Sequence, residues 1–219
     1  MNLPRHLGWL GAAALCLVSV WATVPEAATK PERLSCRANV SHCFAITVYA
    51  SSARLQGLDR FLRRHVAHAN KHFAKIGVGF VLRPTIRLPA AHRHLRTRGD
   101  RDALVKRTAR DGSISLFLVD RLDNVDEPGE IRGVHWRYRA DRRRRAVILS
   151  TKARTWVLTH ELGHFFGLPH SRFDISLMNK RRRKRPISKR TFAPSEYKKM
   201  ARRRDQMLRN RRLVVIKPR

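Results

Sequence analysis

Short apolar runs and one amphipathic segment follow one another along the first half of the chain. Phe44–Tyr49 and Val78–Leu82 are rich in the β-branched and aromatic residues typical of strands. Between them, apolar residues recur at helical spacing from Leu58 to Ile76, and Gly77 follows as a natural helix stop. The uninterrupted apolar run Ile114–Val119 is typical of a strand that is buried on both faces.

The second half predicts further strands and ends in a helix. Strands are expected at Gly133–Tyr138 and Ala146–Ser150, and a short helix is expected around Asp102–Arg110. Ser150 or Thr151 can cap a helix from about Lys152 to Phe166, and Pro194-Ser195-Glu196 is typical of the start of a helix that runs to about Arg209. This order of elements predicts a mixed α/β (α+β) domain.

The N-terminus has the pattern of a secretory signal. Arg5 precedes the almost wholly apolar segment Leu7–Ala22, which is short for a membrane span. We expect cleavage after Ala22, or as late as residue 28, and therefore a secreted protein in a periplasmic or extracellular location. An uncleaved signal anchor is the alternative. After cleavage, no remaining stretch approaches the roughly 20 apolar residues of a membrane span.

Export changes the interpretation of the cysteines. Cys36 and Cys43 remain as an even pair once the signal is removed. In an oxidising compartment, a disulfide between them is the default, and two free thiols are the alternative.

Composition places the chain among globular proteins, but its charge is extreme. Its 219 residues include 48 Lys+Arg and 16 Asp+Glu, a formal net charge of +32. Hydrophobic residues make up 42%, too many for a disordered polybasic chain. A field of this sign attracts polyanions, which for an exported protein are envelope lipids, acidic glycans or extracellular DNA. The sequence does not choose among them.

One segment carries recognisable chemistry: residues 160–170 read H-E-x-x-H-x-x-G-x-x-H. On a helix, His160 and His164 project from one face and can hold one ion. Gly167 can take the positive φ that turns the chain and brings His170 back as a third ligand. Three neutral imidazoles suit Zn²⁺ and leave a position for water, whose proton Glu161 can take as general base.

This motif resembles that of the metzincin zinc endopeptidases, matching it at every fixed position. Met178, in Ser176-Leu177-Met178-Asn179, corresponds to the methionine turn that lies beneath the zinc in that family. Ser171 and the short gap to Met178 are most similar to the matrixin-like subgroup. Lys180 stands where astacin-like members have a tyrosine, and the several downstream cysteines expected of archaemetzincin-like members are missing.

The resemblance implies a twisted five-stranded sheet with two helices above a cleft and a small C-terminal helical lobe containing the Met turn. The catalytic domain that the resemblance implies covers residues 44–219. The leader between the expected cleavage site and this domain, residues 23–43, is short and lacks the zinc-capping cysteine pattern of many matrixin pro-segments. In that domain the upper lobe ends at about residue 167, the lower lobe covers 168–210, and a basic tail covers 211–219. Gly133–Tyr138 is the expected edge strand, to which an extended peptide can pair.

The resemblance also bears on specificity, because the chain after the Met turn shapes the pocket for the side chain that follows the cut. Here that chain is cationic, with Lys180, Arg181, Arg182 and Arg183. We expect a preference for Asp or Glu there, or rejection of Lys and Arg. The alternative is that these residues form a solvated loop or an autolysis site.

Three weaker patterns have competing interpretations. His65, His68 and His72 could face one ion, although a solvated helix face is expected instead. His92, His94 and His135 could form a second, structural zinc site. Five acids between Asp120 and Glu130 could hold Ca²⁺, or could serve as counter-charge to the surrounding arginines.

The leading functional hypothesis is a secreted zinc-dependent endopeptidase, expected to be a monomer acting on protein or peptide substrates. The alternative is a catalytically weak or silent metal-binding polybasic protein that adheres to anionic envelope surfaces or extracellular polyanions.

Overall fold

A computed structural model describes residues 36, 40–51, 56–108, 111–181 and 185–216. The predicted signal peptide, most of the leader, and Arg182 and Arg183 lie outside these described residues. Arg33–Arg219 forms one compact unit. None of the helices in the described part of the chain is long and apolar enough to cross a membrane.

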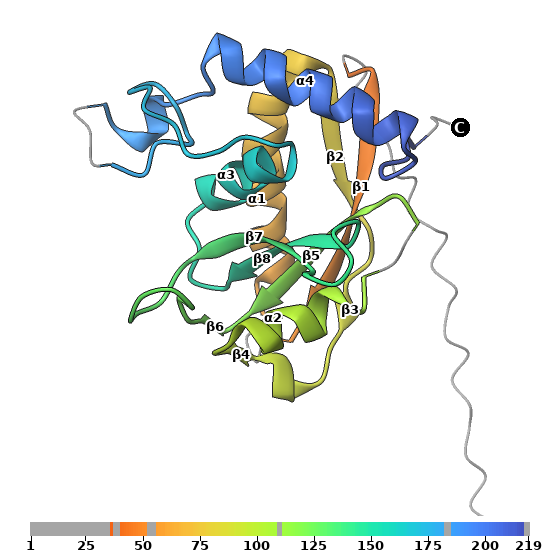
Figure 1. Cartoon of the computed structure of the whole chain (residues 1–219), viewed down its shortest axis with the longest axis vertical. Coiled ribbons are helices and arrows are strands. Elements are labelled where there is room, and N and C mark those ends of the chain that lie inside the picture. Colours follow the sequence, from red (N-terminus) through yellow and green to blue (C-terminus); the bar gives the residue numbers. More distant parts are fainter. Residues whose placement is uncertain (1–35, 37–39, 52–55, 109–110, 182–184, 217–219) are drawn as a thin grey trace, which may run out of the picture. The chain divides into compact units, whose positions relative to one another are not determined.

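A mostly parallel sheet forms the centre of this unit (Figure 1). Its main path has the order β2-β1-β5-β8-β7, and the two-residue strand β3 also pairs with β1. Every pairing in this sheet is parallel except that of β7 with β8. The strands are β1 (His42–Ala50), β2 (Val78–Leu82), β3 (Ile86–Arg87), β5 (Ile114–Val119), β7 (Gly133–Arg137) and β8 (Arg145–Ser150). All five predicted strands are therefore present, and β7 is the edge strand as expected.

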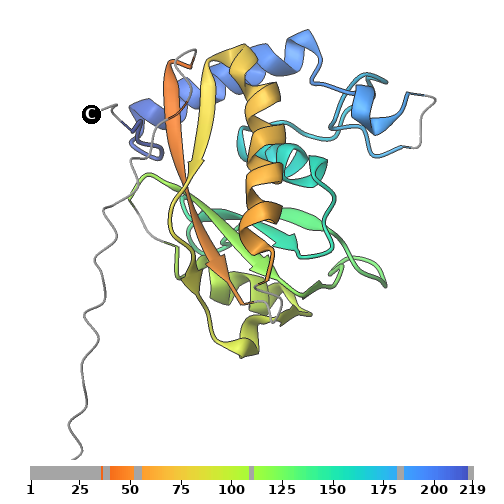
Figure 2. The same cartoon turned by 180° about the vertical axis from the view of Figure 1, so that it is seen from behind.

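Within the described residues, four α-helices accompany the sheet, and β4 (His94–Leu95) and β6 (Arg121–Leu122) form a separate two-stranded ladder. The helices are α1 (Leu58–Phe73), α2 (Arg98–Val105), α3 (Trp156–Phe165) and α4 (Pro194–Arg209). Short 3-10 turns lie at Ala74–Ile76, Ala90–His92 and Ile187–Lys189. In Figure 2, α1 runs alongside β1 and β2, and α4 contacts the turn that ends α1.

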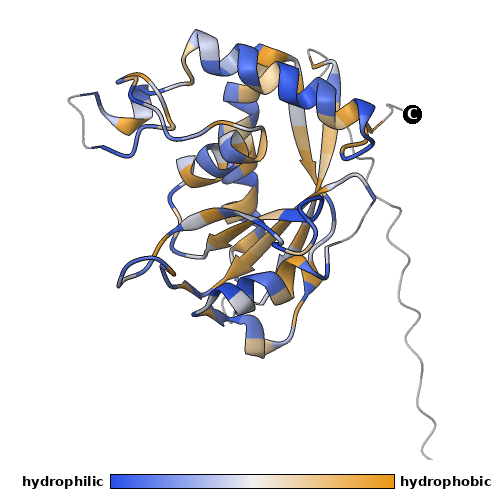
Figure 3. Ribbon diagram, viewed as in Figure 1, coloured by the Kyte–Doolittle hydropathy of each residue, from blue (hydrophilic) through white to orange (hydrophobic). Residues whose placement is uncertain are grey.

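Both faces of the sheet are buried, which explains the uninterrupted apolar runs. Along β5, Leu116 and Leu118 belong to the core shared with α1 and α3, whereas Phe117 and Val119 belong to the core shared with α2. The strands carry most of the hydrophobic colour in Figure 3. Burial on two sides therefore removes the alternation that a half-exposed strand would show.

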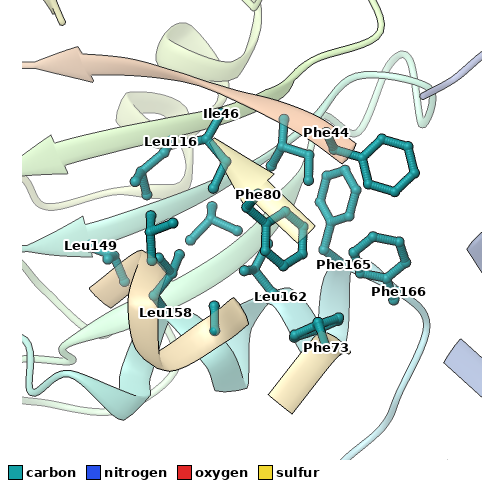
Figure 4. Close-up of a cluster of buried hydrophobic side chains, with 14 of the residues drawn as sticks. Phe44, Ile46, Phe73, Phe80, Leu116, Leu149, Leu158, Leu162, Phe165 and Phe166 are labelled. Carbon is teal, nitrogen blue, oxygen red and sulfur yellow. The ribbon is translucent and has the colours of Figure 1, made fainter. Parts of the chain in front are cut away.

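Aromatic side chains gather at one end of the core between the sheet, α1 and α3, and aliphatic side chains fill the other end (Figure 4). The Phe73 ring lies 5.1 Å from that of Phe80 and 5.4 Å from that of Phe166, measured between centroids. All three are at most 1% exposed. Each such side chain contributes roughly 1.5–3 kcal/mol through burial, so this cluster fixes α1 and α3 against the sheet.

Helix α3 starts later than the sequence indicated. The predicted start at Lys152 with a Ser150 or Thr151 cap is wrong, because Thr151 N–H donates to Val119 O and so continues the sheet. Ser150 Oγ instead accepts from Lys152 N–H in a turn before the helix. The predicted short helix is also displaced: α2 begins at Arg98, where Thr97 and Asp100 form a reciprocal capping box.

The disulfide prediction is confirmed. Cys36 and Cys43 are bonded, with their Cα atoms 5.7 Å apart. The expected basic tail is in part integrated into the fold, since Leu213 is buried and Ile216 N–H donates to Cys43 O.

Candidate metal centre

The three motif histidines come together at the end of α3. His160 and His164 lie one helical turn apart, and Gly167 adopts a left-handed conformation (φ 89°) that reverses the chain toward His170. His164 Nε2 and His170 Nε2 are 3.1 Å apart, and one nitrogen from each ring lies within 4.8 Å of the others. Within the described residues, this is the one group of three or more potential ligands close enough to hold an ion.

Backbone carbonyls set the tautomers of the two helical histidines. Nδ1 of His160 lies 2.7 Å from Leu177 O, and Nδ1 of His164 lies 2.7 Å from Leu168 O. A carbonyl only accepts, so Nδ1 carries the hydrogen and Nε2 keeps its lone pair. The lone pairs of Nε2 are thus available to a cation at the point where the rings converge.

Burial also keeps these imidazoles neutral. Desolvation, together with the neighbouring histidines and Lys180, lowers the pKa of His160 to about 4 and that of His170 to about 4. The pKa of His164 is lowered for the same first reason. A neutral imidazole is the form that ligates metal, so the site is prepared to bind a cation at neutral pH.

Glu161 lies beside the histidines and is 6% exposed. Burial raises its pKa to about 8, partly offset by a backbone hydrogen bond from His135 and by the charge of Lys180. Gly133 permits this approach, because a Cβ there would lie 2.6 Å from Val157 and 3.1 Å from Glu161 Cγ. The missing side chain at Gly133 therefore lets the edge strand β7 lie against the Glu161 side chain.

A buried turn that contains Ser176, Leu177 and Met178 packs against α3, the helix that carries His160 and His164. Ser176 Oγ donates to the Glu196 carboxylate and accepts from Met178 N–H, and Met178 is fully buried. Met178 Sδ packs so closely on α3 that a Cβ on Gly163 would lie 2.6 Å away. Because Leu177 in this turn supplies the carbonyl that orients His160, the turn and the histidines form one unit.

A cleft of about 610 Å³ opens over the three histidines and Glu161. Trp136 on β7 forms part of its wall, fixed by a 2.7 Å hydrogen bond from its indole N–H to Asp102 and by the Arg101 guanidinium over its ring. Lys180 also lines the cleft. Arg181 is exposed and does not line it, and Arg182 and Arg183 are outside the described residues.

The expectation that His65, His68 and His72 form a solvated face is wrong. His65 is 3% and His72 is 7% exposed, because this side of α1 packs against α3 and the chain before α4. His68 pairs with Thr159 Oγ1 and His72 with Thr191 Oγ1. A hydrogen bond at one nitrogen of each ring takes the place of hydration, His65 Nε2 is buried without a partner, and the three rings form no ligand group.

The other two weaker patterns do not gather as ligand sets in the described residues. The acids between Asp120 and Glu130 pair mainly with bases: Asp126 with Arg98, Asp123 with Arg121 and His94, and Glu130 with Arg121, Arg132 and Lys152. These pairs favour the counter-charge interpretation over calcium. His94 is held by Asp123, and His135 packs against Phe165.

Comparison with known proteins supports the fold. No family model and no curated protein matches the sequence. The structure is similar to that of archaemetzincin from Methanopyrus kandleri, at 15% identity and a TM-score of 0.53, over 78% of this chain and 99% of that one. It is also similar to metalloproteinase-II from Bacteroides fragilis, at 12% identity and a TM-score of 0.50, over 74% of this chain and 53% of that one. The chain thus shares the archaemetzincin-type fold, despite its lack of downstream cysteines.

Proposed function

We propose that this protein is a secreted zinc-dependent endopeptidase. The observation that carries the proposal is the convergence of three neutral imidazoles beside a buried carboxyl, Glu161, in an open cleft. His160, His164 and His170 would hold the zinc, and Glu161 would act as general base. The fold adds support, because one of the solved structures to which it is similar, over 53% of that chain, is a metalloproteinase.

The donor set fits zinc. Three neutral nitrogen ligands suit Zn²⁺ better than Ca²⁺ or Mg²⁺, which prefer oxygen. The carbonyls of Leu177 and Leu168 accept hydrogen bonds from Nδ1 of two of the rings. Metal-bound histidines commonly donate their second ring nitrogen to such a partner. When bound, a zinc ion supplies Lewis acidity, lowering the pKa of a bound water toward about 7 and polarising a carbonyl.

The chain's own contribution to hydrolysis is proton transfer and positioning. A carboxylate oxygen of Glu161 takes the proton of the attacking water and then delivers it to the leaving amine nitrogen. Its buried location raises its affinity for the proton, and a backbone hydrogen bond from His135 and the charge of Lys180 lower that affinity in part.

The edge strand supplies a means to hold the substrate. β7 pairs with β8 on one side and ends the main sheet path in the described chain. Residues Gly133, Val134, His135, Trp136 and Arg137 all line the cleft. An extended peptide adding to this edge would lay its backbone across the histidines, which suits an enzyme that cuts within a chain.

Within the metzincins, we assign the chain to the matrixin-like subgroup on its motif. Ser171 after the third histidine, the short spacing to Met178, and Lys180 in place of tyrosine carry this assignment. Met178 would form the hydrophobic floor beneath the metal, consistent with its full burial against α3.

Replacing Glu161 with Gln tests the mechanism. The Glu161→Gln variant should retain one zinc per chain and lose peptide hydrolysis by about a thousandfold, because the general base is gone while the ligands remain. Zinc content by atomic absorption and cleavage of a quenched-peptide pool, with and without chelator, provide the readout. Glu130→Gln, which alters a carboxylate of a surface ion-pair network, serves as the matched control. Near-normal hydrolysis by Glu161→Gln would refute this mechanism.

The same assay distinguishes the alternative function. Stoichiometric zinc in the wild-type protein without turnover of any peptide in the pool would favour a metal-binding polybasic protein that adheres to anionic surfaces. Secretion is tested separately: N-terminal sequencing of protein recovered outside the producing cell should give a start between residues 23 and 29.

A further inference from the structure

A buried arginine at the start of β8 has few partners. Arg145 is 8% exposed, its Nη1 lies 3.4 Å from Phe165 O, and its guanidinium lies 5.5 Å from the centre of the Phe165 ring. Its Nε is buried and has no hydrogen-bond partner in the structure. Burying a cation without compensation is costly, so this side chain requires an explanation.

The charges around Arg145 are of the same sign. Arg137 stands opposite it in the antiparallel pairing of β7 and β8, a placement that is unfavourable for like charges. Burial, and then the charges of Arg203, Arg137 and Arg212, lower the pKa of Arg145 to about 10. None of the ion pairs between described residues includes any of these four arginines.

Another buried arginine shows what compensation looks like in this fold. Arg101 is 2% exposed and its Nε also lacks a partner, but it donates to Asp123 O, lies 4.8 Å from the Trp136 ring centre, and has Asp126 and Asp123 nearby to favour its charge. Arg145 has the aromatic ring but no acid. The missing element at Arg145 is negative charge.

The cluster opens into space large enough for a ligand. Arg145 lines two cavities, one of about 540 Å³ and one of about 500 Å³. Arg212 lines the first, and Arg137 and Arg203 line the second. Arg137 and His164 line both the second cavity and the cleft of the candidate metal centre.

We propose that Arg137, Arg145, Arg203 and Arg212 form a binding site for a doubly charged tetrahedral oxyanion: inorganic phosphate or sulfate, or the phosphate monoester group of a small molecule. Guanidinium groups match the oxygen spacing of such ions and donate paired hydrogen bonds to them. A dianion offsets more of the four positive charges than chloride can. The site adjoins the cleft and shares Arg137 and His164 with its lining, but none of its four arginines is a proposed metal ligand or the general base, so anion binding there does not require peptidase activity.

Titration calorimetry on the zinc-loaded protein tests the site. Inorganic phosphate, inorganic sulfate and glycerol phosphate are each titrated against a background of constant ionic strength set with sodium chloride. We expect saturable binding of at least one of them at one site per chain. The three probes distinguish phosphate from sulfate, and the free ion from an ester.

Two variants locate the site. Arg145→Met and Arg203→Gln should each weaken binding by about tenfold, the loss expected for one charge-assisted donor pair. Arg203 lies on the half-exposed side of α4, so its variant tests the site even where the buried substitution perturbs folding. Arg60→Gln, which removes one exposed positive charge from α1, is the matched control and should bind as the wild type does.

The proposal predicts a second, independent effect. In chloride alone, Arg145→Met should unfold at the same or a higher temperature than the wild type, because an uncompensated buried cation has been removed. Saturating phosphate or sulfate should reverse this order by stabilising only the wild type. No saturable binding of any probe, or equal weakening by Arg60→Gln, would overturn the proposal.

Discussion

At the scale of single residues, the candidate centre depends on two glycines, which have no side chain, as much as on the three histidines. Gly163 on α3 leaves room for Met178 Sδ, and Gly133 on β7 leaves room for Glu161. Each glycine allows one structural element to approach the histidine-bearing helix closely. The turn held by Gly163 also supplies the Leu177 carbonyl that orients His160, so packing and ligand geometry are coupled.

Gly163→Ala should therefore destabilise the protein. A Cβ at this position would lie 2.6 Å from Met178 Sδ and 3.1 Å from Phe192 Cε1, so the fully buried Met178 side chain, or the turn that carries it, has to shift. We expect a net loss of about 1–2 kcal/mol in the free energy of unfolding, because overpacking outweighs the gain of up to about 1 kcal/mol in helix propensity. We also expect weaker zinc binding, measured by competition with a chelator.

A second glycine gives the matched control. Gly99 on α2 is exposed, and a Cβ there would meet only Thr97 Oγ1, at an ordinary 3.6 Å. Gly99→Ala should be neutral or stabilise by up to about 1 kcal/mol, without changing zinc affinity. Similar urea-unfolding results for the two variants would contradict the importance of the Gly163–Met178 contact.

The spacing of the motif was enough to predict that His160, His164 and His170 converge, because helix periodicity and a glycine with positive φ are local properties. Gly163 and Gly133 were not identified, because their role arises only from contacts with Met178 and Glu161, which belong to other elements. Likewise, nothing local distinguishes Arg145 from its neighbours in a run of four arginines; its burial is a consequence of its place at the start of β8.

At the scale of elements, the packing of α1 differs most from expectation. Its apolar positions were identified by their periodicity, but His65 and His72 are also buried. Hydrogen bonds compensate for this burial in part: His65 Nδ1–H donates to Phe61 O and His72 Nδ1 pairs with Thr191 Oγ1, whereas His65 Nε2 has no partner. Periodicity assigns polar residues to the outer face by default, and only the positions of α3 and residue 191 show which of them are enclosed.

This burial gives α1 a pH-dependent contribution to stability. Desolvation, followed by the charges of His68, Lys71 and Lys75, lowers the pKa of His72 from 6.5 to about 4. Between these values the unfolded chain binds a proton that the folded chain does not. Stability from this group is therefore complete above about pH 6.5 and is lost as the pH falls toward about 4.

Replacing His72 with Asn tests this effect, since the amide can still bond Thr191 but does not titrate. In metal-free protein, the wild type should lose on the order of 1–2 kcal/mol more than His72→Asn between pH 7 and pH 5. Urea unfolding at both pH values measures the difference. Parallel pH profiles of the two proteins would show that His72 is not held neutral by the fold.

Element boundaries were predicted least well where tertiary hydrogen bonds compete with local signals. α4 begins at Pro194 as expected, because Glu196 accepts from Ala193 N–H within the same turn. α3 starts after the expected residue, because Thr151 bonds across to Val119 in β5. The capping box that starts α2, Thr97 and Asp100, was present in the sequence as T-x-x-D but was not identified as a helix start.

At the scale of the whole molecule, acids and bases are unevenly distributed. Ion pairs concentrate on the loop between β6 and β7, where Asp123, Asp126 and Glu130 are found. The arginine cluster around Arg145 has no such partners in the described chain. The excess positive charge behind the net +32 therefore lies mainly outside this loop. Its field should attract anionic substrates at low ionic strength.

Lys180 contributes positive charge inside the cleft itself. The charge of Lys180 lowers the pKa of four groups of the candidate centre, namely His160, Glu161, His164 and His170. If the peptidase proposal holds, Lys180 favours a substrate with an acidic side chain immediately after the scissile bond. Exposed charges of this kind contribute less than about 1 kcal/mol, which corresponds to a few-fold in rate.

Peptides that differ only at the residue after the scissile bond test this preference. At low salt we expect kcat/KM to decrease in the order Glu, Leu, Lys, with about a fivefold range that shrinks in 0.5 M salt, roughly where screening shortens the Debye length to a few ångströms. The double variant Lys180→Ser, Arg181→Ser should lose this order. The control double variant, Arg60→Gln with Arg64→Gln, removes the same number of positive charges from the exposed face of α1. It should keep the preference for Glu, because its total charge equals that of the test variant and only the position of the lost charges differs. Equal rates for the three wild-type substrates at low salt, or loss of the preference in both double variants, would exclude Lys180 as the specificity determinant.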